Sequence, residues 1–211
     1  MQLSLFDNNK TDYSHKNYIV LEENRSVYNT VINNLSWQCL ILCGPRNSGK
    51  THLAHIWRST NDAIFINPHN FISDIRYSNA FILEDIHNIQ DEATLLHCYN
   101  YLQENRKRLL MTSSFLPKDL SFKLKDLHSR ILSTMSVKIP PANEELLRIM
   151  LIKKFSDKQL KVDLKVIDYI LMRIERSFNS ISDVIEKIDH KSMGKNITIP
   201  FVSSLLTKHN L

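Results

Sequence analysis

Residues 39–51 read Cys-Leu-Ile-Leu-Cys-Gly-Pro-Arg-Asn-Ser-Gly-Lys-Thr, and this stretch decides the fold. The first five residues are apolar, which predicts a short buried strand. The next eight match Gly-x-x-x-x-Gly-Lys-Thr, the pattern of a phosphate-binding loop between a strand and a helix. Residues 51–59 supply that helix, because Leu53, Ile56 and Trp57 recur at helical spacing. The stretch therefore predicts an α/β protein with a nucleotide site.

The loop residues suit phosphate for separate physical reasons. Backbone N–H groups and the positive end of the following helix attract phosphate oxygens. Gly44 and Gly49 allow close backbone approach, and the chain has only 3 glycines in all. Lys50 would neutralise the β and γ phosphates, and the Thr51 hydroxyl would hold Mg²⁺. The predicted nucleotide-binding residues of the loop are Gly44, Pro45, Arg46, Asn47, Ser48, Gly49, Lys50 and Thr51.

The remaining pattern indicates two parts. Strands are predicted over 63–66, 80–83, 109–112 and 136–139, and helices over 25–35 and 91–105. Strands that alternate with helices are typical of a five-stranded parallel sheet covered on both faces. After Pro140-Pro141 only helices are predicted, over 143–156, 163–175, 180–191 and 199–208. We divide the chain into a flexible tail (1–17), an α/β subdomain (18–140) and a small all-helical lid subdomain (141–211).

Two carboxylates follow the predicted strand at 80–83. Near a phosphate loop, one carboxylate can hold Mg²⁺ partly through water, and the next can orient or deprotonate an attacking water. We therefore predict catalytic roles for Glu84 and Asp85, with Thr51 and Glu84 as the magnesium ligands. The alternative is a solvated strand end. His52 and the other histidines of these segments show no spacing that suits a metal site.

Composition excludes several classes of protein. The 211 residues carry a net charge of +5, which permits only weak or indirect contact with DNA. Three cysteines are too few for a disulfide framework. No apolar run approaches the roughly 20 residues that cross a membrane, and no secretory signal is visible. We expect a cytoplasmic protein with no membrane contact.

Three segments together resemble the DnaA family of AAA+ proteins. They are the phosphate loop, Leu-Glu-Asp-Ile at 83–86, and Leu-Met-Thr-Ser-Ser-Phe-Leu-Pro-Lys-Asp-Leu at 110–120. The resemblance covers about residues 15–208 and implies an AAA+ fold that binds ADP or ATP with Mg²⁺. It also implies that Thr112 and Ser113 act as sensor residues. Tyr18 and Val20 would then contact the base, and the alternative for both is core packing.

The segment Asp-Leu-His-Ser-Arg-Ile at 126–131 is similar to the family's arginine-finger segment. The resemblance implies that Arg130 acts on ATP bound by a partner, while the alternative is an ion pair within the domain. Two positions depart from the family. Glu84 precedes Asp85 where the family has aspartate first, and Asn179 stands where the sensor-2 arginine is expected. Arg176 lies nearby and is the candidate for that sensor. The alternative is that Arg176 is a plain surface arginine. We expect nucleotide binding with weak or no intrinsic hydrolysis, and ADP as the resident nucleotide.

The start of the chain carries a second motif, made of Gln2, Leu3, Ser4, Leu5 and Phe6. It is similar to the consensus by which bacterial proteins dock on the DNA polymerase III sliding clamp (the β subunit); a tail anchored on its own domain is the alternative. The resemblance does not extend to the family's DNA-binding domain. It therefore implies a regulator. Such a regulator binds the clamp and promotes hydrolysis of ATP on the DnaA initiator. Two alternative functions stay open: an autonomous ATPase that loads a helicase, and a non-catalytic adaptor. Assembly as a homodimer also stays open.

Overall fold

The computed structural model describes residues 12–34, 36–71, 76–192 and 196–206. Its five strands are β1 (Cys39–Cys43), β2 (Ile64–Phe65), β3 (Ala80–Leu83), β4 (Arg108–Ser113) and β5 (Met135–Lys138). They form one parallel sheet in the order β2-β3-β4-β1-β5. The parallel five-stranded sheet is confirmed. Because β1 lies between β4 and β5, the phosphate loop leaves the sheet beside the ends of two other strands.

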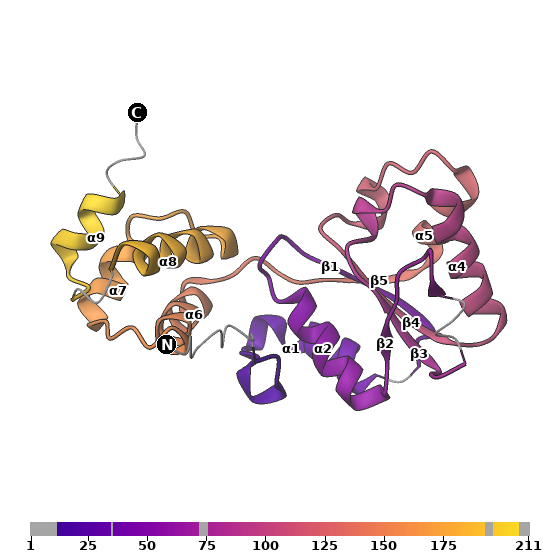
Figure 1. Ribbon diagram of the computed structural model, residues 1–211, viewed down its shortest axis with the longest axis horizontal. Coiled ribbons are helices and arrows are strands. Elements are labelled where there is room, and N and C mark those ends of the chain that lie inside the picture. Colours follow the sequence, from indigo (N-terminus) through magenta and orange to yellow (C-terminus); the bar gives the residue numbers. More distant parts are fainter. Residues whose placement is uncertain (1–11, 35, 72–75, 193–195, 207–211) are drawn as a thin grey trace, which may run out of the picture.

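Helices cover both faces of the sheet. They are α1 (Glu22–Tyr28), α2 (Lys50–Asn61), α4 (Glu92–Glu104) and α5 (Lys125–Ser133). Side chains alternate along β1, so Leu40 and Leu42 join the core beneath α1 and α2, while Ile41 and Cys43 join the core beneath α4 and α5. Figure 1 shows α1 and α2 on the side of the sheet toward the lid, and α4 and α5 on the other.

Four helices follow the last strand. They are α6 (Glu144–Asp157), α7 (Leu164–Leu171), α8 (Phe178–Ser192) and α9 (Ile199–Leu206), and they enclose their own apolar core. The chain reaches them through the extended segment after β5 (Figure 1). Leu146 and Phe178 of these helices also pack against the core beneath α1 and α2, so the lid is attached to the sheet layer by apolar contact as well.

Two local features differ from the expectation. The predicted helix over 25–35 begins earlier, at Glu22, and its last part is a wider π-helical turn over Asn29–Asn33. There the Thr30 carbonyl accepts from the Trp37 indole at 2.9 Å, which is a tertiary contact that the helical pattern does not contain. Helix α5 was not predicted, although Leu127 and Ile131 are buried at the i, i+4 spacing of a helix.

Among the described residues, no helix is long and apolar enough to cross a membrane.

Candidate nucleotide site

The phosphate loop is tied to the sheet at its first residue. The Gly44 N–H donates to the Ser113 carbonyl at 3.0 Å, and α2 begins at Lys50. Gly49 has a φ of 92°, and a Cβ there would lie 3.1 Å from Cε2 of Tyr18. A Cβ on Gly44 would lie 2.8 Å from Oγ of Ser48. The two glycines are therefore required by backbone conformation and by close contact, as the motif predicts.

Lys50 is a buried cation held by backbone carbonyls. Its Nζ donates to the Gly44 carbonyl at 2.9 Å and to the Pro45 carbonyl at 3.0 Å. Burial lowers the pKa of Lys50, and the charges of Asp85 and Glu84 oppose that shift. No carboxylate among the described residues forms an ion pair with this ammonium. A buried ammonium without a counter-ion suits an anionic ligand such as phosphate.

The two carboxylates lie beside the loop in different roles. The Thr51 hydroxyl donates to Oε1 of Glu84 at 2.7 Å. The Asp85 backbone N–H donates to Oγ1 of Thr112 at 2.9 Å, and Asp85 has a left-handed φ of 49°. Thr112 is buried at the end of β4, so it fixes the backbone that presents both acids. The sequence predicted that Thr51, Glu84 and Asp85 lie beside the loop, and the structure brings them together with Thr112 at one edge of the sheet.

These residues fit a nucleotide with Mg²⁺. Thr51 and Glu84 present two oxygens within hydrogen-bond distance of each other, and hard oxygen ligands are what Mg²⁺ prefers. Oγ of Ser48 is buried in the loop and has no partner among the described residues. A phosphate oxygen would satisfy that hydroxyl. When bound, the metal held by Thr51 and Glu84 would neutralise phosphate charge.

A cavity of about 720 Å³ extends from the phosphate loop to the lid. Asn47, Ser48 and Gly49 line one end. Its apolar wall includes residues from both parts of the chain: Ile19, Leu21, Ile139, Leu146, Met150, Phe178 and Ile185. The volume and the mixed apolar and polar wall are those of a typical small-molecule site. A base would lie between the sheet layer and the lid.

The two residues predicted to contact the base lie in different surroundings. Tyr18 lines the cavity, and its ring stacks on Tyr28 with centroids 5.9 Å apart. Burial raises the pKa of Tyr18, so its hydroxyl is neutral at all physiological pH values. Val20 packs against the core beneath α1 and α2 and is not among the lining residues. The structure thus brings Tyr18, but not Val20, to the cavity wall.

The predicted sensor residues have mainly structural partners. Oγ of Ser113 accepts from the Phe115 N–H at 3.0 Å, and Ser113 is fully buried. Arg176 forms an ion pair with Glu144 at 3.0 Å, and its side chain is 71% exposed. Arg46 is exposed on the loop. In contrast, Asn179 does reach the loop, because its side-chain oxygen accepts from the Asn47 amide at 3.2 Å.

Arg130 lies apart from this cavity. Its Nε is 3.3 Å from a carboxylate oxygen of Asp126, one turn earlier on α5, and its side chain is 44% exposed. Among the described residues, the ion pair of this guanidinium is thus within its own helix. The start of α5 is fixed by Glu92, whose two carboxylate oxygens accept from the backbone N–H groups of Lys123 at 3.0 Å and Leu124 at 2.7 Å. The arrangement holds the helix while leaving the guanidinium exposed.

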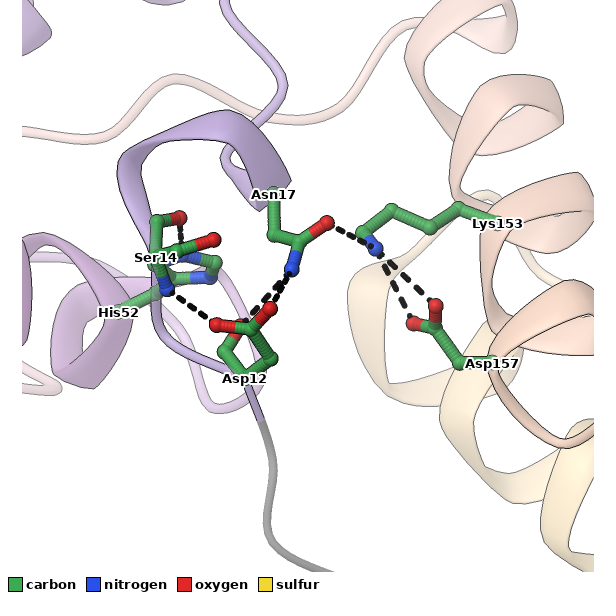
Figure 2. A network of polar contacts seen from close by, with 6 residues as sticks. All are labelled: Asp12, Ser14, Asn17, His52, Lys153 and Asp157. Carbon is green, nitrogen blue, oxygen red and sulfur yellow. Dashed lines mark hydrogen bonds and ion pairs between the residues drawn. The ribbon is translucent and has the colours of Figure 1, made fainter.

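The segment before Tyr18 lines part of the cavity through Asp12 and Asn17. Asn17 lies between Asp12 on its own segment and Lys153 on α6, and His52 holds the same segment on α2 (Figure 2). Sequence reasoning missed these contacts and the one between Asn47 and Asn179. No periodicity or motif signals them, because single polar residues far apart in sequence meet. The predicted clamp motif at 2–6 lies outside the described residues.

Comparison with known proteins shows which ones this chain is similar to. Residues 144–206 match the family model described as "Hda, lid domain". The chromosomal replication initiator protein DnaA of Borrelia garinii subsp. bavariensis is 22% identical over 211 residues, which cover 85% of this chain and 44% of that protein. The lid segment matches the Hda lid family, and the chain is similar to DnaA over most of its length. It spans less than half the length of that relative.

Solved structures of DnaA show the same fold as this DnaA-related chain. Domain III of the Thermotoga maritima replication initiation protein DnaA superposes with a TM-score of 0.77 at 18% identity, covering 93% of this chain and 96% of that one. AMPPCP-bound DnaA from Aquifex aeolicus gives a TM-score of 0.65 at 21% identity, covering 86% and 66%. The sheet with its helical lid therefore has the AAA+ fold, as the resemblance implied.

Proposed function

We propose that this DnaA-related chain is a nucleotide-binding regulator of replication initiation that acts on ATP held by the DnaA initiator. The observation that supports the proposal is the position of Arg130. The guanidinium is exposed on α5, and its ion pair in the described part of the chain is with Asp126 of the same helix. Arg130 is not among the residues that line the chain's own cavity. A guanidinium in that position is free to reach a nucleotide held by another protein.

The chemistry is the cleavage of the γ-phosphoryl group of initiator-bound ATP by water, giving ADP and phosphate. An arginine supplied from a partner stabilises the charge that develops on the transferred group, which raises the rate by on the order of 10³–10⁵. The initiator would supply the phosphate loop and the metal. This chain would supply Arg130, held by α5 and by the Glu92 anchor at the start of that helix.

Docking on the sliding clamp is the second part of the proposal. Residues 2–6 carry the side chains that such a linear motif needs, with Leu3, Leu5 and Phe6 for apolar pockets and Gln2 for a hydrogen bond at the rim. Tethering the regulator to a clamp on DNA would raise its effective concentration near the initiator without new contacts. The regulator would then work in the cytoplasm, on the chromosome.

The proposal is tested by ATP hydrolysis on purified initiator in the presence of clamp and DNA. Arg130→Ala should return the rate to that of the initiator alone, and Arg130→Lys should not restore it, because an ammonium lacks the planar fork of a guanidinium. Lys125→Ala on the same helix is the matched control and should leave stimulation intact. Unimpaired stimulation by Arg130→Ala would show the assignment to be wrong.

The clamp contact needs its own measurement. Replacing Leu5 and Phe6 by alanine should abolish binding to the clamp while ADP still binds the chain. Unchanged clamp affinity would remove this part of the proposal and leave the role of Arg130 to be judged alone. Efficient turnover by the purified chain, without clamp or initiator, would instead favour an autonomous ATPase, for which Thr51, Glu84 and Asp85 are already in place.

A further inference from the structure

The segment Asp12–Tyr18, which we call the strap, is a pre-formed element. Both carboxylate oxygens of Asp12 are used: Oδ1 accepts from the Ser14 N–H at 2.8 Å and Oδ2 accepts from the Asn17 amide at 2.6 Å. The Asn17 N–H also donates to the Ser14 carbonyl at 3.0 Å, which closes a 3₁₀ turn over His15–Asn17. The Asn17 side chain is therefore held by its own segment as well as by the lid.

One side of the strap is docked on α2, the helix that the phosphate loop opens. Nε2 of His52 donates to the Ser14 carbonyl at 2.9 Å. The Tyr13 ring stacks on His55 with centroids 4.1 Å apart and planes 2° from parallel. His52 and His55 are the second and fifth residues after Lys50, so the strap is held within two helical turns of the phosphate loop.

The other side of the strap meets the lid. Nζ of Lys153 on α6 donates to Oδ1 of Asn17 at 3.1 Å (Figure 2). Asp157, one turn further along α6, accepts from the same ammonium at 3.1 Å and 3.2 Å. Lys153 is thus aimed at the strap by a carboxylate of its own helix, as Asn17 is aimed by Asp12. Each member of the contact has a second partner that holds it in place.

This contact lies at the edge of the nucleotide cavity. Asp12, Asn17 and Tyr18 line that cavity from the strap, and Lys153 lines it from the lid. The loop and the lid also meet directly, through Asn47 and Asn179. The strap therefore joins two parts of the chain that both line the cavity, namely its own segment and α6 of the lid.

We propose that Asn17 and Lys153 form a latch that holds the lid against the strap and slows the release of bound nucleotide. Both are positioning residues, since they act through the lid. The latch rests on the proposed nucleotide site and is independent of the proposed action on the initiator. Its contribution is one charge-assisted hydrogen bond between elements more than a hundred residues apart in sequence.

The test is the rate at which a fluorescent ADP analogue dissociates from the full chain in stopped flow. Asn17→Ala and Lys153→Met should each raise the dissociation rate about 3–10-fold, the range expected for one charge-assisted hydrogen bond, with little change in the association rate. The double variant should dissociate no faster than the single ones, because both remove the same contact. Lys153→Arg keeps a donor, so its dissociation rate should stay close to that of the unaltered chain.

Lys187→Met is the matched control, since Lys187 is exposed on α8 and has no ion pair among the described residues. It should leave the dissociation rate unchanged. If the two residues only helped to pack the fold, their variants would unfold at a lower temperature without nucleotide. The dissociation rates of the single and double variants would then not show the non-additive pattern expected for the latch. Unchanged rates in Asn17→Ala and Lys153→Met, or additive effects in the double variant, overturn the latch.

The outcomes for the two proposals can be told apart. Failure to bind ADP at all would overturn the latch and the nucleotide site together. Normal latch behaviour with no stimulation of the initiator would leave the latch standing and remove the proposed function. If the latch variants stimulate the initiator but release ADP at the original rate, the proposed function stands and the latch is removed.

Discussion

The Asn47 side-chain amide donates a hydrogen bond to the Asn179 side-chain oxygen at 3.2 Å, which joins the phosphate loop to the second residue of α8 in the lid. Asn47 holds a positive φ of 62° at the loop, so its side chain projects from an unusual backbone conformation. Both partners are neutral. This amide pair joins the lid to the phosphate loop without a charged partner.

A neutral contact predicts that the lid responds equally to ADP and ATP. Asn179→Ala should weaken the affinity for both nucleotides by the same factor, about 3–10-fold, because an uncharged hydrogen bond does not sense the added γ-phosphate. Asn179→Arg should shift the ratio of affinities toward ATP by about tenfold, since a guanidinium attracts the extra charge. Calorimetry with both nucleotides measures the ratio, and Asn196→Arg is a control on an exposed lid residue. A loss in Asn179→Ala that affects ATP alone would contradict the prediction.

Lys50 should be needed for ligand binding and dispensable for the fold. Lys50→Met should lower ADP affinity at least 100-fold, because the phosphates lose their main counter-ion. The melting temperature without nucleotide should stay unchanged or rise, since a buried cation that is bound only by carbonyls is costly to desolvate. Thermal unfolding and ADP titration measure the two effects. Lys138→Met, which removes an exposed cation at the end of β5, should change neither; a large drop in apo stability for Lys50→Met would count against this account.

The anchor at the start of α5 should influence Arg130 from a distance. Glu92→Ala removes both acceptors for the Lys123 and Leu124 N–H groups, and we expect stimulated hydrolysis on the initiator to fall about tenfold as the helix loses its fixed start. Glu92→Gln keeps one acceptor and should fall less. Clamp binding should be unaffected in both. Glu104→Ala, at the other end of α4, is the control, and an equal loss in that variant would point to a general effect on α4.

His55 should make the stability of the protein depend on pH. Burial lowers the pKa of His55 below the ordinary 6.5; Glu84 opposes the shift, and Arg58 and His52 reinforce it. The unfolded chain therefore binds a proton near pH 6 that the folded chain does not, so the free energy of unfolding falls as the pH drops below about 6.5. His55→Gln should flatten that slope in urea unfolding between pH 5 and 7. His190→Gln, at an exposed site on α8, should leave it as it is, and an unaltered slope in His55→Gln would refute the prediction.

The local elements could be predicted from sequence because each depends on neighbours along the chain. The strands at 39–43 and 80–83 have the bounds that their apolar runs predict. The strand at 63–66 is shorter, since only Ile64 and Phe65 find ladder partners on β3. The phosphate loop, Thr51 and Glu84 also meet as predicted, because the motif fixes one side and the order of the strands brings the other.

Contacts between distant parts of the chain could not be predicted in this way. Asn47 and Asn179 are 132 residues apart, and Asn17 and Lys153 are 136 apart. Each pair depends on how the lid lies over the sheet, which is set by apolar packing of residues such as Phe178 and leaves no mark on the polar partners. The Glu92 anchor was missed for a related reason, because a carboxylate that accepts backbone N–H groups needs no partner of any particular type.

The strap directly continues residues 1–11, where the proposed clamp motif lies. A partner that grips those residues would exert its pull on the segment that is docked beside the phosphate loop and held by Lys153. Mechanical tension on the start of the chain would thus be carried to the wall of the nucleotide cavity. Binding of the clamp to residues 2–6 would then also change how long the nucleotide stays bound.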